Sequence, residues 1–526
     1  MVFHGGFFSR AIVWITIMVT GVGAACFAAD DDAPPPRRQL TPDELLRKRI
    51  AESLAGRRDL RAPKSETLRG PDLTDREKVA HVLNRLSYGA TPGDVDDVIK
   101  NGGWQAWAKR QLEGDKIDDA DCDKIIAERF PWTKMTIAQL RDAYNGPGNR
   151  ERMYQLHSQL PECVLTRAVL SKRQFKEVMC DFWRNHFCVD QPREEEKSRS
   201  WTDADYEQQV IRRYVFGKFG EMLYASARHP AMLEYLDNKL SKANSWNENY
   251  AREVMELHTL GADRGYGNLD VQELSKVLTG WRYDDNFNFI FDSSWHQPGV
   301  KHWLGMTIPQ GYQGGLEALR VLATHPNTSE FISQKLCQYL VNDNPPPALV
   351  RKVAGVFRET QGDLPKVYWA IISSPEFLNQ DNYRAKFKTP FQFTVSALRA
   401  TAANVENAAE ACQTVAKMGE PIYNCPDPTG YRDQAESWMD AGVLTTRWQF
   451  AWNVVRGAVS GVRVPEPFFN YYRRMKPAEA EQKMIEDLIG GDIGDRELAA
   501  LKEAAVNQDV PRMTSILLGS PSFQQR

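Results

Sequence analysis

Residues 236–261 read LDNKLSKANSWNENYAREVMELHTLG, and this stretch carries the clearest structural signal in the chain. Its second half has helical periodicity, with one face formed by Tyr250, Val254 and Leu257 and another by Asn249, Glu253 and Glu256. We expect this helix to begin at Asn247 and to end at His258, before a Gly261 cap. The stretch therefore predicts a short amphipathic helix preceded by an amide-rich loop.

The same helix supplies the candidate catalytic residues, which are Glu253, Glu256 and His258. The two carboxylates lie one turn apart, near enough to hold a cation together or to raise one another's pKa for proton transfer. The alternative is a solvated face with ion pairs, because Arg252 precedes Glu256 by four residues. His258 also has a structural alternative, since a cationic imidazole is favoured at the C-terminus of a helix.

The loop and the first turn of the helix supply candidate binding residues. Carboxylates, amides and a guanidinium are concentrated there and offer oxygen ligands and hydrogen-bond donors: Asp237, Asn238, Asn247, Glu248, Asn249 and Arg252. Such side chains serve equally well as helix caps and turn residues that hold a loop in shape. The sequence leaves both interpretations open.

Histidines from distant segments complete a predicted metal site. His186 follows two aromatic residues, whereas His296 and His325 stand beside turn residues, where a side chain is freer to reach a site. If these imidazoles meet Glu253 and Glu256, the mixed nitrogen and oxygen ligands suit zinc, manganese or iron. A divalent metal is therefore the cofactor to look for, although the chain has no His-Glu-x-x-His motif. The alternative for His186 is a core histidine.

Helix signals dominate the rest of the chain and predict an all-α, multi-helical body over residues 72–526. Thr74 and Glu77 form a capping box at its first helix. Strand-like alternation is confined to residues 281–291, which predicts one small β-hairpin. The length exceeds what a single core usually supports, so we expect one large or two closely packed domains, with a sub-boundary near residues 345–385.

Residues 363–377 and 509–523 resemble one another. Each copy begins with Asp-x-Pro, continues with apolar residues at helical spacing and ends with Ser-Pro-x-Phe. Aspartate is a good N-cap and proline ends a helix, so the pattern predicts a duplicated helical hairpin. The alternative is a common helix ending that arose twice.

The N-terminus has the features of an export signal. Arg10 precedes an apolar run to Val22, small residues follow, and Asp30 begins an acidic segment. We interpret residues 1–29 as a signal peptide and residues 30–71, which are charged and rich in proline, as a disordered linker. The alternative is an uncleaved anchor, which would be the only membrane contact. We therefore expect a periplasmic or extracellular protein, attached to the cell surface if the anchor remains.

The net charge and the cysteines bear on two properties, which are nucleic-acid binding and disulfide formation. The formal charge is −3 and the pI is about 6.4, so there is no basic excess for nucleic-acid binding. Cys412 and Cys425, separated by a turn-rich segment, are the best disulfide candidates in an oxidising compartment. Buried free thiols are the alternative.

Beyond residues 236–261, six further blocks carry a family pattern: 81–92, 182–187, 270–281, 296–305, 325–326 and 421–430. Together they resemble a bacterial exported family known only as domain of unknown function 1800. The resemblance implies an exported, mostly helical protein and a co-exported partner protein. The chain departs from the family at Gln297, where an aspartate is frequent, and at Trp303, where a threonine or phenylalanine is common. A carboxylate role at position 297 is therefore excluded here.

Two functions fit these features. The first is a metal-assisted, hydrolase-like enzyme that acts on an envelope or extracellular polymer. The second is a non-catalytic surface or periplasmic scaffold that binds a partner protein or a glycan, in which the same polar cluster holds its own loop in place. They differ in where the acidic side chains point, which is toward imidazoles in the first and toward water in the second.

Overall fold

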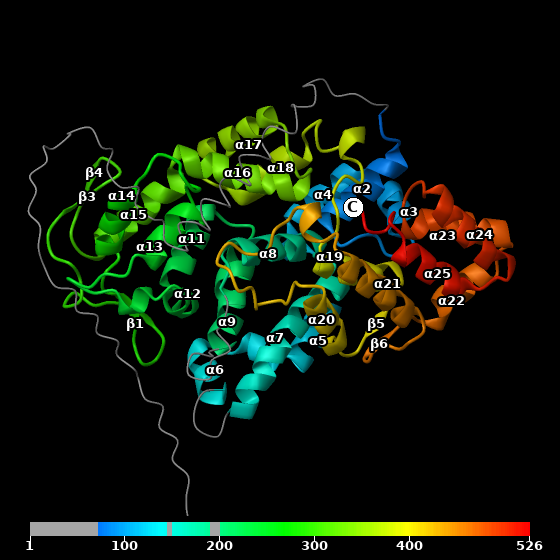
Figure 1. The fold of residues 1–526 in the computed structure, drawn as a ribbon, viewed down its shortest axis with the longest axis horizontal. Helices are drawn as coiled ribbons and strands as arrows, with labels where there is room; N and C mark the ends of the chain where they lie inside the picture. The colour runs from blue at the N-terminus through cyan, green and yellow to red at the C-terminus, as the bar shows by residue number, and fades with distance from the viewer. Residues whose placement is uncertain (1–71, 145–149, 190–199) are drawn as a thin grey trace, which may run out of the picture. The chain divides into compact units, whose positions relative to one another are not determined.

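A computed structural model describes residues 72–144, 150–189 and 200–526 (Figure 1). The predicted signal peptide, residues 1–29, and the predicted linker, residues 30–71, lie outside the described residues. The described residues all belong to one compact unit. The sub-boundary predicted near residues 345–385 falls inside this unit.

The described chain is built of helices joined by short connections. The first group is α2 (Asp75–Leu86), α3 (Asp94–Lys100), α4 (Gly103–Leu112), α5 (Ala120–Arg129), α6 (Ile137–Tyr144), α7 (Arg150–Leu170), α8 (Gln174–His186), α9 (Ser200–Tyr206) and α10 (Arg212–Tyr214). The second is α11 (Phe219–Arg228), α12 (Pro230–Tyr235), α13 (Asn249–Glu256), α14 (Asn268–Val277), α15 (Tyr312–Thr324), α16 (Pro326–Leu340), α17 (Pro347–Glu359) and α18 (Leu364–Ile372). The third is α19 (Pro390–Ala400), α20 (Ala409–Lys417), α21 (Ala441–Val455), α22 (Glu466–Arg473), α23 (Pro477–Leu488), α24 (Asp495–Val506) and α25 (Val510–Gly519). The all-α prediction is confirmed.

Strands are few and short in the described residues. Three antiparallel pairs occur: β1 (Trp281–Tyr283) with β2 (Phe289–Phe291), β3 (Lys301–Trp303) with β4 (Met306–Ile308), and β5 (Asn404–Val405) with β6 (Val462–Arg463). The first pair is the hairpin that the alternation predicted, with Trp281 opposite Phe291. Gly315 on α15 lets Trp281 pack closely against that helix, because a Cβ at position 315 would stand 2.3 Å from Cζ2 of the indole.

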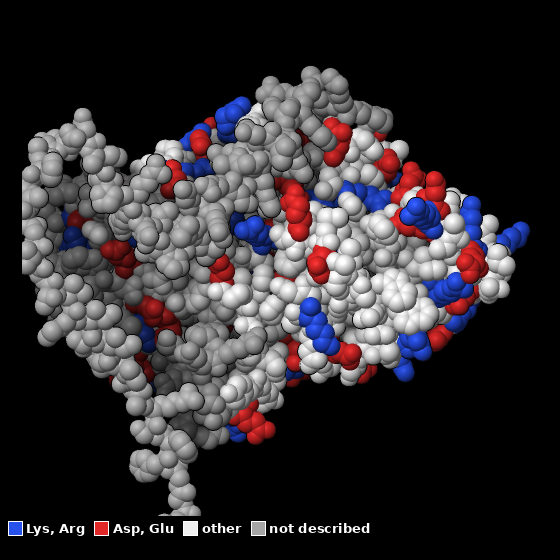
Figure 2. Space-filling view, viewed as in Figure 1, with Lys and Arg blue, Asp and Glu red and all other residues white. Residues whose placement is uncertain are grey.

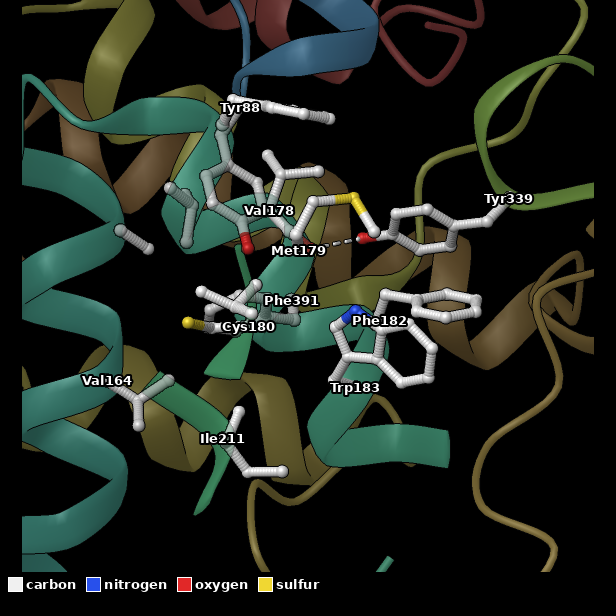
Figure 3. Close-up of a cluster of buried hydrophobic side chains, with 14 of the residues drawn as sticks. Tyr88, Val164, Val178, Met179, Cys180, Phe182, Trp183, Ile211, Tyr339 and Phe391 are labelled. Carbon is white, nitrogen blue, oxygen red and sulfur yellow. Dashed lines mark hydrogen bonds between the residues drawn. The ribbon is translucent and has the colours of Figure 1, made fainter. Parts of the chain in front are cut away.

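Helix α8 runs through the middle of the core and is buried on nearly every side (Figure 3). Val178, Met179 and Trp183 are fully buried on it, and Tyr339 from α16 donates a hydrogen bond to the main-chain oxygen of Val178 at 3.3 Å. Phe391 brings α19 to the same cluster. Burial of each large apolar side chain contributes about 1.5–3 kcal/mol, so the packing of α8 contributes strongly to the stability of the core.

Local signals located several helix ends correctly. The hydroxyl of Thr74 accepts from the N–H of Glu77, whose carboxylate accepts from the N–H of Thr74, so the predicted capping box is confirmed. In the repeat, the Asp363 carboxylate caps α18 and the Asp509 carboxylate caps α25.

Both copies of the repeat also end in the same turn. The hydroxyl of Ser374 accepts from the N–H of Phe377 at 3.2 Å, and that of Ser520 accepts from the N–H of Phe523 at 3.1 Å. Helix α18 packs on α17 and α25 packs on α24, so each copy supplies the second helix of a helical hairpin.

Candidate functional site

The loop before α13 is held by its own polar side chains. Asn238 is buried and its amide nitrogen donates to the main-chain oxygens of Leu278 and Trp281, at 3.3 and 3.1 Å. Asp237, half-buried just before it, has a φ of +57°, a conformation that aspartate tolerates better than most residues. Asn238 therefore joins the loop to the end of α14 and to β1.

A second pair of contacts closes the loop onto the helix. The Ser241 hydroxyl accepts from the N–H of Asn247 at 3.1 Å, and the Asn247 side chain accepts from the N–H of Asn249 at 2.8 Å. The helix begins at Asn249, two residues later than predicted, because Asn247 acts as a turn residue ahead of it. Asn249 itself is exposed.

The acidic face of α13 carries a ladder of ion pairs. Arg252 lies 3.1 Å from the Glu248 carboxylate and 3.7 Å from that of Glu256. The exposed fraction of the side chain is 26% for Arg252, 34% for Glu248 and 31% for Glu256. Glu253 is half-buried on the same helix. For Glu256, this geometry agrees with the alternative of a solvated face with ion pairs. The nearby Arg252 guanidinium partly neutralises the Glu256 carboxylate, which weakens its attraction for a metal cation.

His258 lies in the turn after α13, because the helix ends at Glu256. Its side chain is buried, and Nε2 has no hydrogen-bond partner among the described residues. Burial, with a smaller effect of the nearby Lys335, lowers the pKa of His258 to about 3. The interpretation of a cationic imidazole stabilised by the helix dipole is therefore wrong, because the cost of burying the charge exceeds the gain from the dipole.

His186, the last residue of α8, is the one predicted metal ligand that meets His258. Its Nε2 lies 3.1 Å from the main-chain oxygen of His258, and the two ring centroids are 6.2 Å apart. Phe182 stacks on its ring at 6.1 Å. Burial lowers the pKa of His186 well below the ordinary value, with Lys335 adding to the effect. The pair is neutral and packed among aromatic rings.

The other two predicted ligands hold local structure. His296 Nδ1 lies 3.0 Å from the main-chain oxygen of Thr279, and its Nε2 accepts from the N–H of Gly311 at 3.0 Å. His325 caps α16, where its Nδ1 accepts from the N–H of Asn327 at 3.1 Å. Both imidazoles are thus engaged in hydrogen bonds to the main chain.

The predicted metal site does not form within the described residues. No group of three or more His, Cys, Asp and Glu side chains in residues 72–144, 150–189 and 200–526 is arranged to hold a metal ion. The structure does not bring together the set predicted for that role, which is His186, Glu253, Glu256, His296 and His325. The reason is geometric, because His296 and His325 bond to main-chain groups near them and His186 Nε2 lies 3.1 Å from the main-chain oxygen of His258.

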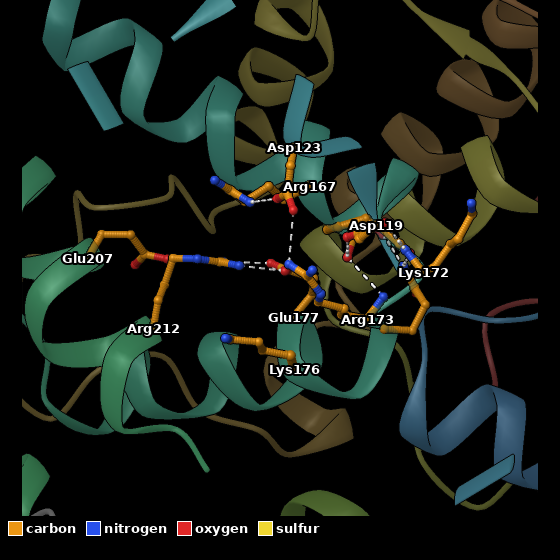
Figure 4. Close-up of polar contacts among 12 residues, drawn as sticks. Asp119, Asp123, Arg167, Lys172, Arg173, Lys176, Glu177, Glu207 and Arg212 are labelled. Atoms are coloured by element: carbon orange, nitrogen blue, oxygen red, sulfur yellow. Dashed lines mark hydrogen bonds and ion pairs between the residues drawn. The ribbon is translucent and has the colours of Figure 1, made fainter. Parts of the chain in front are cut away.

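A buried chain of alternating charges was not predicted. The Glu177 carboxylate faces the Arg212 guanidinium and accepts two hydrogen bonds from it, at 2.6 and 2.7 Å (Figure 4). Glu207, in a π-helical turn over residues 207–211, accepts two more from Arg184, both at 3.0 Å. Burial alone raises the pKa of each glutamate, but the arginines outweigh it and hold both pKa values below the ordinary one.

A second buried acid has the opposite character. Glu420 follows α20, and its carboxylate accepts from the N–H of Phe391 at 2.7 Å. Burial and, next, the nearby Asp181 raise the pKa of Glu420 to about 8. The carboxyl group is therefore largely protonated at neutral pH. Neither Glu420 nor the chain of buried charges can be predicted from a local sequence pattern, because the interacting residues come from segments far apart in the sequence.

A cleft of about 800 Å³ opens between α2–α4 on one side and the ends of α7 and α19 on the other. Its volume is in the range of small-molecule sites. Arg399 is buried there, and its Nη2 lies 3.7 Å from the Asp94 carboxylate. The charged residues that line the cleft are balanced, with four acidic and four basic side chains: Asp94, Asp97, Glu113, Asp118, Arg110, Lys116, Lys172 and Arg399.

Comparison with known families agrees with the blocks seen in the sequence. Residues 81–525 match the family described as Protein of unknown function (DUF1800). The chain belongs to the DUF1800 family. No curated protein and no solved structure matches it significantly. In this DUF1800 chain, residues 236–261 form the signature segment. Its loop is held against the end of α14 and β1 by the hydrogen bonds of Asn238.

Cysteine chemistry in this DUF1800 chain differs from the disulfide prediction. Neither Cys412 nor Cys425 forms a disulfide, and neither do the other five cysteines of the described residues. Cys412 sits on α20, and burial raises its pKa well above the ordinary value. The alternative of free thiols, all but one of them fully buried, is the one observed.

Within residues 72–144, 150–189 and 200–526, no helix combines the length and the apolar character needed to cross a bilayer.

Proposed function

We propose that this chain is an exported, non-catalytic scaffold that binds a partner protein or a glycan. The observation that carries the proposal is that polar side chains of the signature segment are engaged in holding the segment itself. Asn238, Ser241 and Asn247 bond to main-chain groups, and Arg252 pairs with Glu248, just before its own helix, and with Glu256 on that helix. A site prepared for catalysis would instead direct such groups toward a shared point in space.

The hydrolase hypothesis receives less support from the same geometry. An imidazole whose pKa is about 3 is a weak general base at neutral pH, and His258 is in that state. Glu256 is half exposed beside Arg252 and lacks a neighbouring imidazole in the ion-pair ladder. The cleft at α2–α4, by contrast, has the volume and the balanced charge to receive a polar segment of a partner or a glycan.

A comparison of two variants tests the proposal. Glu256→Gln removes one carboxylate of the predicted catalytic pair, and Asn238→Ala removes the side chain that joins the loop to two main-chain oxygens. We expect Glu256→Gln to change the free energy of unfolding by less than about 0.5 kcal/mol, as usual for a surface residue. Asn238→Ala removes the donor to the main-chain oxygen of Trp281, whereas the oxygen of Leu278 still accepts from the N–H of Trp281, and it should cost about 1–3 kcal/mol.

The metal content of the purified full-length chain is measured at the same time by elemental analysis. One equivalent of a divalent metal in the wild type, lost in Glu256→Gln at unchanged stability, would contradict the scaffold proposal and favour the enzyme. Equal metal content in the two proteins, together with the large loss of stability in Asn238→Ala, supports the scaffold.

A further inference from the structure

The outward face of α21 carries a row of large apolar side chains. Trp448 and Leu444 are 54% and 38% exposed, and Trp452 is half-buried. They follow one another at a spacing of four residues, which places them along one side of the helix. We call Leu444, Trp448 and Trp452 the α21 platform. Trp448 is the most exposed tryptophan among the described residues.

The two indoles of the platform form an ordered pair. Their planes are within 6° of parallel, and their centroids lie 6.2 Å apart. The Arg456 guanidinium stands 5.4 Å from the centroid of the Trp452 ring. On the other side, Trp448 rests against Gly519 of α25, where a Cβ would lie 2.7 Å from Cδ1 of the indole. These contacts hold the rings in place before any ligand arrives, which lowers the entropy lost on binding.

Apart from Arg456 at its C-terminal end, the exposed side of α21 carries no charged side chain. Between the capping residue Asp440 and Arg456, the helix carries one charged side chain, Arg447, which is buried and bonds to Gln524 and to the main chain of Lys388. Figure 2 shows the corresponding surface as white over α21, with charged side chains farther out. The exposed neighbours Thr445 and Gln449 are polar and neutral. A ligand suited to this face is neither acidic nor basic.

We propose that the α21 platform binds an uncharged polysaccharide. The face of an indole carries the negative part of its quadrupole, so it attracts the weakly positive C–H groups on the face of a pyranose ring. The neutral amide of Gln449 beside it can bond to sugar hydroxyls. The inference rests on the proposed function, because it gives the scaffold a ligand class, and it places that ligand outside the α2–α4 cleft.

A second copy of the chain fits the platform less well. A stable dimer buries roughly 800 Å² on each partner. Three side chains that bury at most about 150–250 Å² each supply roughly half to nine-tenths of that area, and α21 carries no exposed charge that would orient a partner. An acidic polymer is also disfavoured, since the nearest guanidinium, on Arg456, already lies over Trp452.

Affinity electrophoresis of the full-length chain tests the proposal. The protein is run in native gels that contain hydroxyethyl cellulose, laminarin or, as the anionic probe, alginate. We expect slower migration in at least one neutral polymer and no change in alginate. Trp448→Ala should raise the dissociation constant about tenfold, the factor that corresponds to about 1.4 kcal/mol.

Two further variants make the result specific. Trp448→Gln keeps a side chain of moderate size at the same exposed position and should weaken binding to a similar extent. Trp246→Ala removes a half-buried tryptophan far from the platform in the sequence and should leave migration in the polymer gels unchanged. Melting followed by circular dichroism is recorded for each protein, so that a folding defect is recognised.

Three outcomes overturn the proposal. They are an absence of retardation in every neutral polymer, equal retardation in the wild type and both Trp448 variants, and a concentration-dependent dimer in sedimentation velocity that Trp448→Ala abolishes. Each leaves the scaffold proposal standing, because that proposal is decided by the metal content and stability of the Glu256 and Asn238 variants.

Discussion

Replacing Glu420 by glutamine should make the protein more stable at alkaline pH. Glu420 is 8% exposed, and burial together with Asp181 raises its pKa from 4.5 to about 8. The folded state therefore binds this proton more tightly than the unfolded state does. Stability is highest below the unfolded pKa and declines as the pH rises toward the folded one, because the carboxyl must either lose its proton in a buried place or keep it at a cost.

The size of the effect follows from the pKa change. About 3.5 pH units at 1.36 kcal/mol each give a total of about 5 kcal/mol, of which roughly 3 kcal/mol falls between pH 5.5 and 8.5. In Glu420→Gln the side-chain amide oxygen can still accept from the N–H of Phe391, as Oε2 of Glu420 does now. The variant has no proton to lose. The free energy of unfolding of the wild type should therefore fall by about 3 kcal/mol relative to Glu420→Gln over that range.

Urea unfolding at pH 5.5, 7.0 and 8.5, followed by circular dichroism, measures this difference. Glu406→Gln, at an exposed position, is the matched control and should follow the wild type at each pH. Comparison with the variant at each pH removes the contribution of every other titrating group. Parallel curves for the wild type and Glu420→Gln would refute the reasoning, since they would mean that Glu420 ionises alike in the folded and unfolded states.

Three other substitutions test separate parts of the structure. The pKa of His258 is lowered to about 3, so the wild type should lose about 2 kcal/mol relative to His258→Gln when the pH falls from 6.5 to 4.5, as measured by urea unfolding. Arg212→Gln leaves the buried Glu177 without its main partner and removes a second cation near Glu207, so it should cost about 3–5 kcal/mol of unfolding free energy; a cost below 1 kcal/mol would contradict the ion-pair account. Gly315→Ala places a methyl group against the Trp281 ring and should lower stability by about 1–3 kcal/mol, although alanine is the better helix former; a raised melting temperature would show that the indole can move aside.

The amphipathic pattern of α13 already indicates that Glu256 points toward water. Tyr250 and Val254 form the apolar face of α13 and are buried, at 1% and 0% exposure. A short helix with one apolar stripe buries that stripe and leaves the opposite side toward water. The side that carries Glu256 is therefore outside, where Arg252 reaches it. The hypothesis of inward carboxylates required both faces of one helix to be buried.

The sequence by itself determined what depends on neighbours within a few residues. The capping box at Thr74, the aspartate caps of the repeat and the β1–β2 hairpin are local, because their hydrogen bonds join residues that the chain already holds close together. Helical periodicity gave the all-α class for the same reason.

Only the tertiary structure decided the electrostatics of the interior. Glu207 meets Tyr423 across 216 positions, and Glu420 meets Phe391 across 29. Whether a carboxyl group is paired with arginine or protonated depends on which distant helices bury it. Trp448 and Trp183 differ in the same way, since one lies on the surface and the other is fully buried. Exposure and pKa are set by packing between elements, and no local pattern records that packing.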